Sequence, residues 1–254
     1  IEGVAWGTVV GELFGVAAAS VILAPRFLAG PRPGLARILD LRAITRILSL
    51  NADIMIRSFS LLAAFALFAR QGAQLGTVTL AANAILLNFF FVAGYFLDGF
   101  ATAAEQLAGR AIGAHHARAF RRVIRLACLW GLGLAVVFSS FFLIMGQALI
   151  ELSTTAPEVR AMATAFLPWA ALTAITGVLA FEMDGVFIGA TWSQDMRNMM
   201  LMSLAIFVLW LVAVGDSLGN HGLWMALHIF LIVRGVSLLI ILPKRMRETF
   251  GGDE

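Results

Sequence analysis

Charged residues are scarce in this chain. Asp, Glu, Lys and Arg make up 13% of its 254 residues, whereas they make up roughly 25% of a typical soluble domain. Hydrophobic residues make up 61%, and the mean hydropathy is +0.92. A soluble domain of this length needs a charged surface, so the composition excludes an ordinary soluble protein and indicates a membrane protein.

Cysteine is nearly absent. Cys128 is the only one and lies within an apolar run, which excludes an intrachain disulfide and favours a small buried hydrophobic residue. The net charge is +3, but the arginines are spread between apolar runs instead of forming one basic face. We therefore expect no nucleic-acid partner.

Motifs of enzymes and cofactor sites are also missing. The sequence has no glycine-rich phosphate loop, no zinc-type spacing of His and Cys, and no nucleophile elbow. The neighbouring His115 and His116 lack the spaced acidic or cysteine partners of a metal site. The sequence therefore predicts neither an enzyme nor a cofactor-dependent protein.

Long apolar runs are present instead, and seven of them are long enough to cross a bilayer. Their approximate ranges are 4–23, 47–68, 75–113, 126–149, 162–188, 198–214 and 223–242. Pro168 is expected to kink the fifth run. The predicted fold class is all-α, a polytopic membrane bundle of about seven transmembrane helices.

Basic residues fall in alternate connections between these runs. Five arginines lie in the segment 26–46 and five more in 110–125, whereas the connections on the other side hold only Arg70 and Arg160. Loops rich in Arg and Lys stay in the cytoplasm. The bias predicts that segments 26–46 and 110–125 are cytoplasmic, and that the second half of the first is an amphipathic interfacial helix.

Two adjoining stretches resemble a known family. LAANAILLNF and LDGFATAAEQLAGRAIGA, at 80–89 and 97–114, resemble the eighth transmembrane helix and following loop of the MATE (multidrug and toxic compound extrusion) transporters, within the DinF-like branch. NADIMIR, GAQLG, DGVFIGAT and MRNMM resemble segments of the same branch in the same order. The resemblance covers about 51–200.

The resemblance implies one lobe of a fold built from two six-helix lobes. We expect residues 1–25 to be the last helix of the N-terminal lobe, 26–46 an interlobe loop, 47–243 the C-terminal six-helix lobe, and 244–254 a cytoplasmic tail. The chain starts at Ile1 and not at Met, which suggests a piece of a longer protein. Its expected partners are the missing N-terminal lobe, membrane lipids and small organic substrates.

The implied function is secondary active efflux. Organic cations or toxic hydrophobic compounds would leave the cell in exchange for protons or sodium across a bacterial inner membrane, with the ion gradient in place of a cofactor. One alternative is a flippase of the same superfamily for a lipid-linked saccharide or peptidoglycan precursor, although this needs a strongly basic cavity. A second alternative is a membrane interaction protein that transports nothing.

Polar side chains inside the apolar runs are the candidates for the transport path or for coupling, because such groups are costly in hydrocarbon. They are Asp53, Arg57, Asn83, Asn88, Asp98, Glu105, Glu182, Asp184 and Arg234.

Two candidates lie on the second apolar run. Asp53 and Arg57 have the spacing of an i,i+4 ion pair, which could be structural or part of a gate. NorM-type proteins carry an acidic ion-site residue where Arg57 aligns. The arginine there argues against a sodium site in this lobe, and protons are preferred as the coupling ion because the chain has titratable acids without a cluster of oxygen ligands.

The remaining acids allow both structural and functional interpretations. Asp98 lies on the transport path or contacts another helix, and Glu105 is expected to pair with a loop arginine such as Arg110. Glu182 and Asp184 stand close enough in sequence to repel, so one of them could be titratable. Alternatively, both are solvated at a helix end.

The other candidates are a cation and two amides. Arg234 is expected to pair with a buried carboxylate. Asn83 and Asn88 could hydrogen-bond across helices or to a ligand. Two phenylalanine-rich runs, near 89–91 and 138–142, are interpreted mainly as lipid-facing or packing surface.

Overall fold

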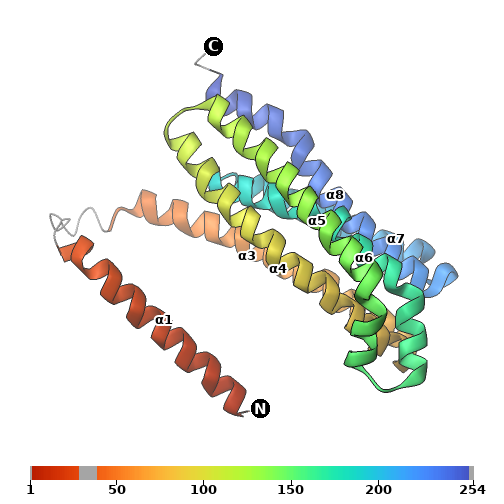
Figure 1. The fold of residues 1–254 in the computed structure, drawn as a ribbon. Coiled ribbons are helices and arrows are strands. Elements are labelled where there is room, and N and C mark those ends of the chain that lie inside the picture. The colour runs from red at the N-terminus through yellow and green to blue at the C-terminus, as the bar shows by residue number, and fades with distance from the viewer. Residues whose placement is uncertain (1, 29–38, 252–254) are drawn as a thin grey trace. The chain divides into compact units, whose positions relative to one another are not determined.

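The structure is a computed structural model that describes residues 2–28 and 39–251. Its elements in chain order are α1 (Glu2–Leu28), α3 (Leu41–Gln74), α4 (Thr77–Gly113), α5 (Ala117–Ser153), α6 (Pro157–Gly189), α7 (Ser193–Trp210), the π-helix η1 (Leu211–Gly215) and α8 (Asp216–Phe250) (Figure 1). Seven helical segments are long and apolar enough to cross a membrane. The predicted all-α polytopic bundle is confirmed.

The helices extend beyond their apolar runs. We predicted that the first run ends at Pro25, but α1 continues to Leu28. We also predicted a separate interfacial helix before residue 47, whereas α3 is one helix from Leu41 onward. Arginines are good helix formers, so a change in polarity does not by itself end a helix. Residues 29–38 of the predicted interlobe loop lie outside the described residues.

The C-terminal boundary shifts in the same way. Lys244, Arg245 and Arg247 were predicted to follow the last helix, but α8 runs on through Pro243 to Phe250. Ion pairs of Arg245 and Lys244 with Glu248 support this last part of the helix.

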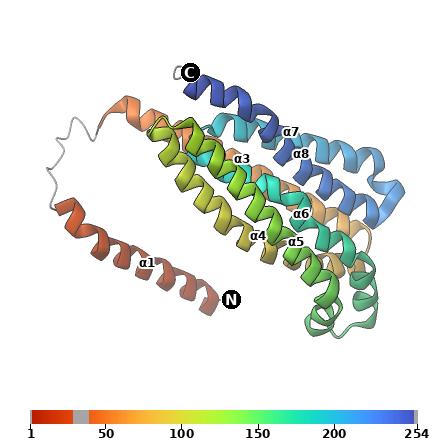
Figure 2. The same ribbon diagram turned by 45° about the horizontal axis from the view of Figure 1, so that its top comes forward.

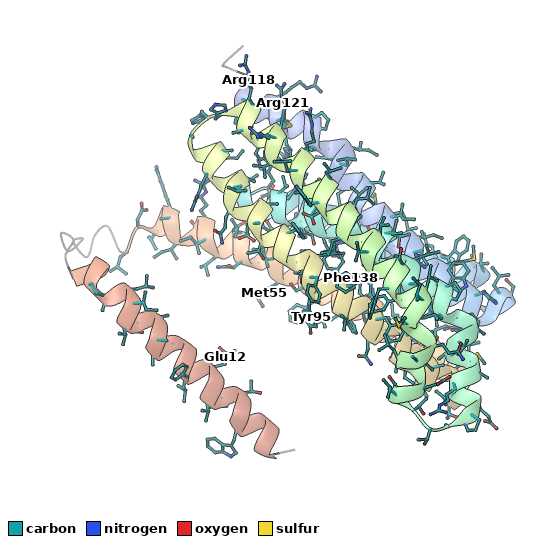
Figure 3. All side chains as sticks on the ribbon, in the orientation of Figure 1. Glu12, Met55, Tyr95, Arg118, Arg121 and Phe138 are labelled. Atoms are coloured by element: carbon teal, nitrogen blue, oxygen red, sulfur yellow. The ribbon has the colours of Figure 1, made fainter. Side chains whose placement is uncertain are left out.

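The chain divides into two compact units, residues 1–48 and 49–254. In the first unit the described side chains of α1 are almost all exposed, and Glu12 is labelled among them in Figure 3. The second unit contains α4 to α8 and the greater part of α3. Apolar side chains of its six spanning segments pack against one another, so this unit holds the core.

Helix α6 is central in the second unit, where it packs against α4, α5 and α8. Its long contact with α4 is visible in both views (Figures 1 and 2). A Cβ atom on Gly185 would collide with the carbonyl oxygen of Ala101, and one on Gly189 with that of Glu105. Small residues let membrane helices approach this closely. The glycines therefore fix how α6 lies on α4.

The apolar core has two parts along the bundle. One includes Phe68, Leu86 and Trp224, and the other includes Phe120 and Phe187. Along α4, α6 and α8 the change from the first part to the second falls near residues 98, 182–184 and 234. A polar layer that holds Asp98, Glu182, Asp184 and Arg234 therefore lies between two apolar clusters.

Candidate functional site

Asp184 is the centre of a charged cluster that joins three helices. Its Oδ2 atom accepts hydrogen bonds from Arg57 of α3 and Arg234 of α8. The side chains of Asp184 and Arg234 are 6% and 4% exposed, and that of Arg57 is 17% exposed. The prediction that Arg234 pairs with a buried carboxylate is confirmed. We call these three residues the charged triad.

The triad contains two cations and one anion. Among the described residues, Asp184 Oδ1 and the Nε atoms of both arginines are buried and have no hydrogen-bond partner. Bringing charge into hydrocarbon is costly unless it is balanced. The triad therefore carries an unbalanced positive charge.

The predicted pair between Asp53 and Arg57 is wrong. Asp53 instead accepts a hydrogen bond of 2.8 Å from the hydroxyl of Ser193, and it forms an ion pair with Arg197. Both partners lie in the first turns of α7. Arg57 turns to Asp184 because that carboxylate is buried and would otherwise be left with a single partner. Ion pairs with residues of other helices are favoured over an i,i+4 ion pair within α3, because such a pair stabilises a helix by only about 0.2–0.5 kcal/mol.

A pocket of about 270 Å³ lies beside the triad. Arg57, Arg234 and Asp98 contribute to its wall, and Asp98 comes from α4. Asp98 is exposed and has no ion-pair partner within the described part of the chain, although the charges of both arginines act on it. The predicted place of Asp98 on a transport path stays a prediction.

Aromatic residues supply much of the remaining wall. They are Phe65, Phe90, Phe91, Tyr95 and Phe181. Figure 3 labels Tyr95 on α4. The rings of Phe65 and Phe91 have centroids 5.3 Å apart, and those of Phe90 and Phe181 are 6.1 Å apart. The pocket therefore combines ring faces with guanidinium groups.

Glu182 lies away from this pocket, although it is only two residues from Asp184. Positions two apart on an α-helix point about 200° apart around its axis, so the two carboxylates take nearly opposite sides of α6. Glu182 faces α5, where a Cβ atom on Gly131 would come within 2.5 Å of its Oε1. The expected repulsion between the two acids was wrong because it assumed a shared face.

The carboxyl group of Glu182 is isolated. The residue is 0% exposed, and neither side-chain oxygen has a hydrogen-bond partner among the described residues. The alternative in which Glu182 and Asp184 are solvated at a helix end is also wrong, since both are buried.

Two candidates on α4 are less enclosed. Glu105 is half-buried, and the ion pairs of the described residues do not include the predicted one with Arg110. Arg110 is exposed to solvent in this structure, where a weak surface pair has little to gain. Asn88 is exposed as well, so its role stays a prediction.

Asn83 belongs to a buried network across helices. Its Nδ2 donates to Asn220 Oδ1 at 2.7 Å, and its Oδ1 accepts from Trp224 Nε1 at 3.0 Å and from Asn220 Nδ2 at 3.1 Å. Of the two interpretations for Asn83, the structure supports the bond between helices α4 and α8.

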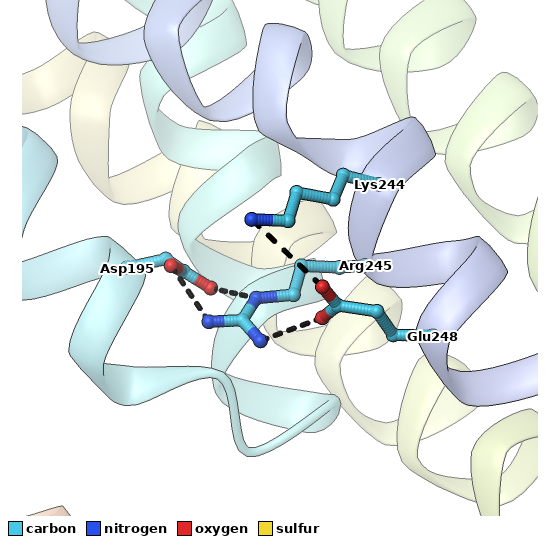
Figure 4. Close-up of polar contacts among 4 residues, drawn as sticks. All are labelled: Asp195, Lys244, Arg245 and Glu248. Atoms are coloured by element: carbon cyan, nitrogen blue, oxygen red, sulfur yellow. Dashed lines mark hydrogen bonds and ion pairs between the residues drawn. The ribbon is translucent and has the colours of Figure 1, made fainter.

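One ionic cluster was missed in the sequence. Arg245 donates from Nε and Nη2 to the two oxygens of Asp195, at 2.5 and 2.9 Å, and from Nη1 to Glu248 at 2.8 Å (Figure 4). Lys244 also lies 3.9 Å from Glu248. The i,i+3 spacing of Arg245 and Glu248 could have indicated a helix here. The contact with Asp195 could not be read locally, because α7 and α8 meet only in the fold.

Within residues 2–28 and 39–251, the His, Cys, Asp and Glu side chains form no group of three or more that could hold a metal ion.

The fold and the charged layer define a polytopic membrane protein of the helical-bundle class. The sequence profile described as MatE matches residues 54–214, more than half of the chain. The chain therefore belongs to the MATE family, in agreement with the predicted resemblance, and it is a multi-pass membrane protein.

Individual relatives support this assignment. The chain is 39% identical over 203 residues to DNA damage-inducible protein F of Escherichia coli (strain K12), which covers 80% of this chain and 44% of that protein. It is 27% identical over 228 residues to the probable multidrug resistance protein NorM of Chromobacterium violaceum, covering 85% and 48%. The chain thus spans about half the length of these relatives.

A solved structure shares the fold. The crystal structure of MATE in complex with MaL6 superimposes with a TM-score of 0.67 at 18% identity, covering 77% of this chain and 43% of that chain. The helical arrangement described above is therefore shared with that MATE structure.

Proposed function

We propose that the whole protein is a secondary active exporter of toxic hydrophobic compounds, driven by protons that enter a bacterial cell across its inner membrane. This chain would supply one lobe, and the partner lobe and lipids would complete the path. No bond is made or broken in this proposal, so it needs no enzyme activity and no cofactor. Family membership supports efflux, and Glu182 carries the argument for proton coupling.

A buried carboxyl group with no partner is far more stable when protonated. Removing an ionised carboxylate from water without a counter-charge or hydrogen bonds costs several kcal/mol or more. In the described conformation Glu182 therefore holds a proton. A conformation that opens the contact between α5 and α6 to water would let the proton leave.

This property links proton binding to alternating access. The protonated form of Glu182 favours a closed contact with Gly131, and the ionised form favours a hydrated one. Asp184 is unsuited to this role, because its arginine partners hold it ionised. We therefore assign coupling to Glu182 and a structural and substrate-facing role to the triad.

The flippase alternative stands second. A lipid-linked pyrophosphate carries several negative charges, whereas the two arginines beside the pocket already share Asp184 and face Asp98. The pocket has too little positive charge left to balance such a head group.

The test uses the whole native protein in proteoliposomes that contain a pH-sensitive dye. Ethidium is added under an imposed proton gradient, and both ethidium movement and internal pH are followed. We expect Glu182→Gln to abolish proton movement coupled to ethidium. Glu158→Gln changes an exposed acid on the same helix and should behave as the wild type.

Coupled proton movement that persists in Glu182→Gln would refute the assignment to Glu182. Transport that follows a sodium gradient and ignores the proton gradient would refute proton coupling itself. Organic cations are among the substrates expected from the family resemblance, and ethidium is a member of that class.

A further inference from the structure

We infer that the pocket beside the charged triad binds the acidic group of a small aromatic acid, so that the substrates include aromatic monoanions. The inference rests on the proposed export function and specifies its substrate class. It is argued from the charge of the triad, the place of Asp98 and the aromatic wall.

The charge balance of the triad favours an anion. Arg57 and Arg234 share the single carboxylate of Asp184, so one positive charge lacks a buried counter-charge. Arg234 is almost fully buried and still contributes to the pocket wall. An anion entering the pocket meets this excess charge beside a nearly buried guanidinium group, where electrostatic attraction is stronger than in bulk water.

The hydrogen-bonding capacity of the two arginines is also not exhausted. A guanidinium group has five N–H donors in a planar fork that suits a carboxylate. Each arginine directs one Nη2 to Asp184, and neither Nε has a partner among the described residues. A small shift of either side chain would let the spare donors reach an acidic group in the pocket.

Asp98 acts as a competitor for the same charge. It lines the same pocket as the arginines, is exposed, and has no ion-pair partner within the described residues. A ligand carboxylate that binds the arginines must compete with the electrostatic attraction between Asp98 and the arginines. Asp98 therefore weakens anion binding and makes release possible, as a transporter requires.

The aromatic wall selects the rest of the molecule. Five aromatic side chains surround the pocket, whose volume of about 270 Å³ lies near the lower end of the roughly 300–1,000 Å³ of ligand pockets. A flat group of one or two fused rings suits this space and can stack on or meet the edge of these rings. An organic cation would gain the same stacking but would face two guanidinium groups.

The test compares three ligands with the same ring system and different charge: 2-naphthoate, 2-naphthamide and 2-naphthylmethylamine. Binding to the whole native protein in lipid nanodiscs is measured at pH 7 by titration calorimetry, with no ion gradient. We expect naphthoate to bind about tenfold more tightly than the amide, since bonds to charged groups are strong. The amine should bind most weakly.

Two variants and a control locate the effect. Asp98→Asn removes the competing charge and should tighten naphthoate binding by about threefold or more. Arg57→Gln should remove the preference for the acid over the amide. Arg110→Gln changes an exposed arginine on the same helix as Asp98 and should leave all three affinities unchanged.

Equal binding of the three ligands, or tightest binding of the amine, would overturn the inference. So would an Asp98→Asn variant that binds naphthoate more weakly. If Arg57→Gln does not fold, the ligand series and Asp98→Asn still decide. The proposed function can fail independently of this inference. If the protein prefers the anion but does not export in exchange for protons, the anion site is supported and the proposed function is refuted. If it exports in exchange for protons but prefers the cation, the proposed function is supported and the anion site is refuted.

Discussion

Two carboxylates on α6 are balanced in opposite ways. Asp184 is neutralised by two arginines from other helices, whereas Glu182, two residues earlier, has no hydrogen-bond partner among the described residues and is neutralised by a proton in our proposal. Both are buried, and they lie two residues apart on one helix. The side of the helix on which a buried acid lies, and not burial alone, therefore decides whether it is fixed by ion pairs or free to titrate.

The largest expected effect is a difference in protein stability between variants of the two acids. Asp184→Asn leaves two buried arginines without a counter-charge and should destabilise the protein by about 3–5 kcal/mol. Glu182→Gln replaces a protonated acid by a neutral amide of similar shape and should change stability by less than about 1 kcal/mol. Thermal unfolding of the whole protein in detergent compares the variants. A loss in Glu182→Gln as large as that in Asp184→Asn would refute the distinction.

A smaller effect tests the close contact of Glu182 with α5. Gly131→Ala places a methyl group against the carboxyl group and should cost about 1–3 kcal/mol through overpacking. Gly133→Ala on the same helix meets open space and is the control. Combining Gly131→Ala with Glu182→Ala should recover most of the loss in thermal stability. Purely additive losses would show that the two residues do not touch.

The smallest effect concerns the exposed ionic cluster of α7 and α8. Arg245→Gln removes the paired bonds to Asp195 and the contact with Glu248. Because the arginine is 33% exposed, water replaces part of what is lost, and the cost should be about 1 kcal/mol or less. Chemical denaturation of the whole protein measures it. A loss matching that of Asp184→Asn would mean that exposure does not separate structural from surface ion pairs here.

Much of the candidate site was visible in the sequence as a set of residue types. Asp184, Glu182 and Arg234 were recognised because charged residues in apolar runs need a reason to be there. Arg234 pairs with a buried carboxylate, as predicted, but the predicted ion pair between Asp53 and Arg57 was wrong. Local spacing could suggest a pair, yet it could not compete with carboxylates and arginines brought in by other helices.

Helix ends were predicted less well than helix cores. Apolar runs marked the membrane-spanning parts, but α5 begins at Ala117 and α8 ends at Phe250, well outside the runs at 126–149 and 223–242. Hydropathy reports what a helix faces, whereas the helix itself continues as long as its backbone bonds and side-chain pairs support it.

The sequence by itself determined the all-helical membrane fold, its family and the residues that carry charge into the bilayer, because hydrophobic length and residue type are local properties. Only the tertiary structure decided that Arg57 and Arg234 meet at Asp184, that Asp53 bonds to α7, and that Glu182 faces Gly131. These contacts depend on which helices are neighbours and how each is rotated about its axis. Both are set by close packing of small residues such as Gly185 and Gly189 against backbone that is far away in sequence, at Ala101 and Glu105 of α4.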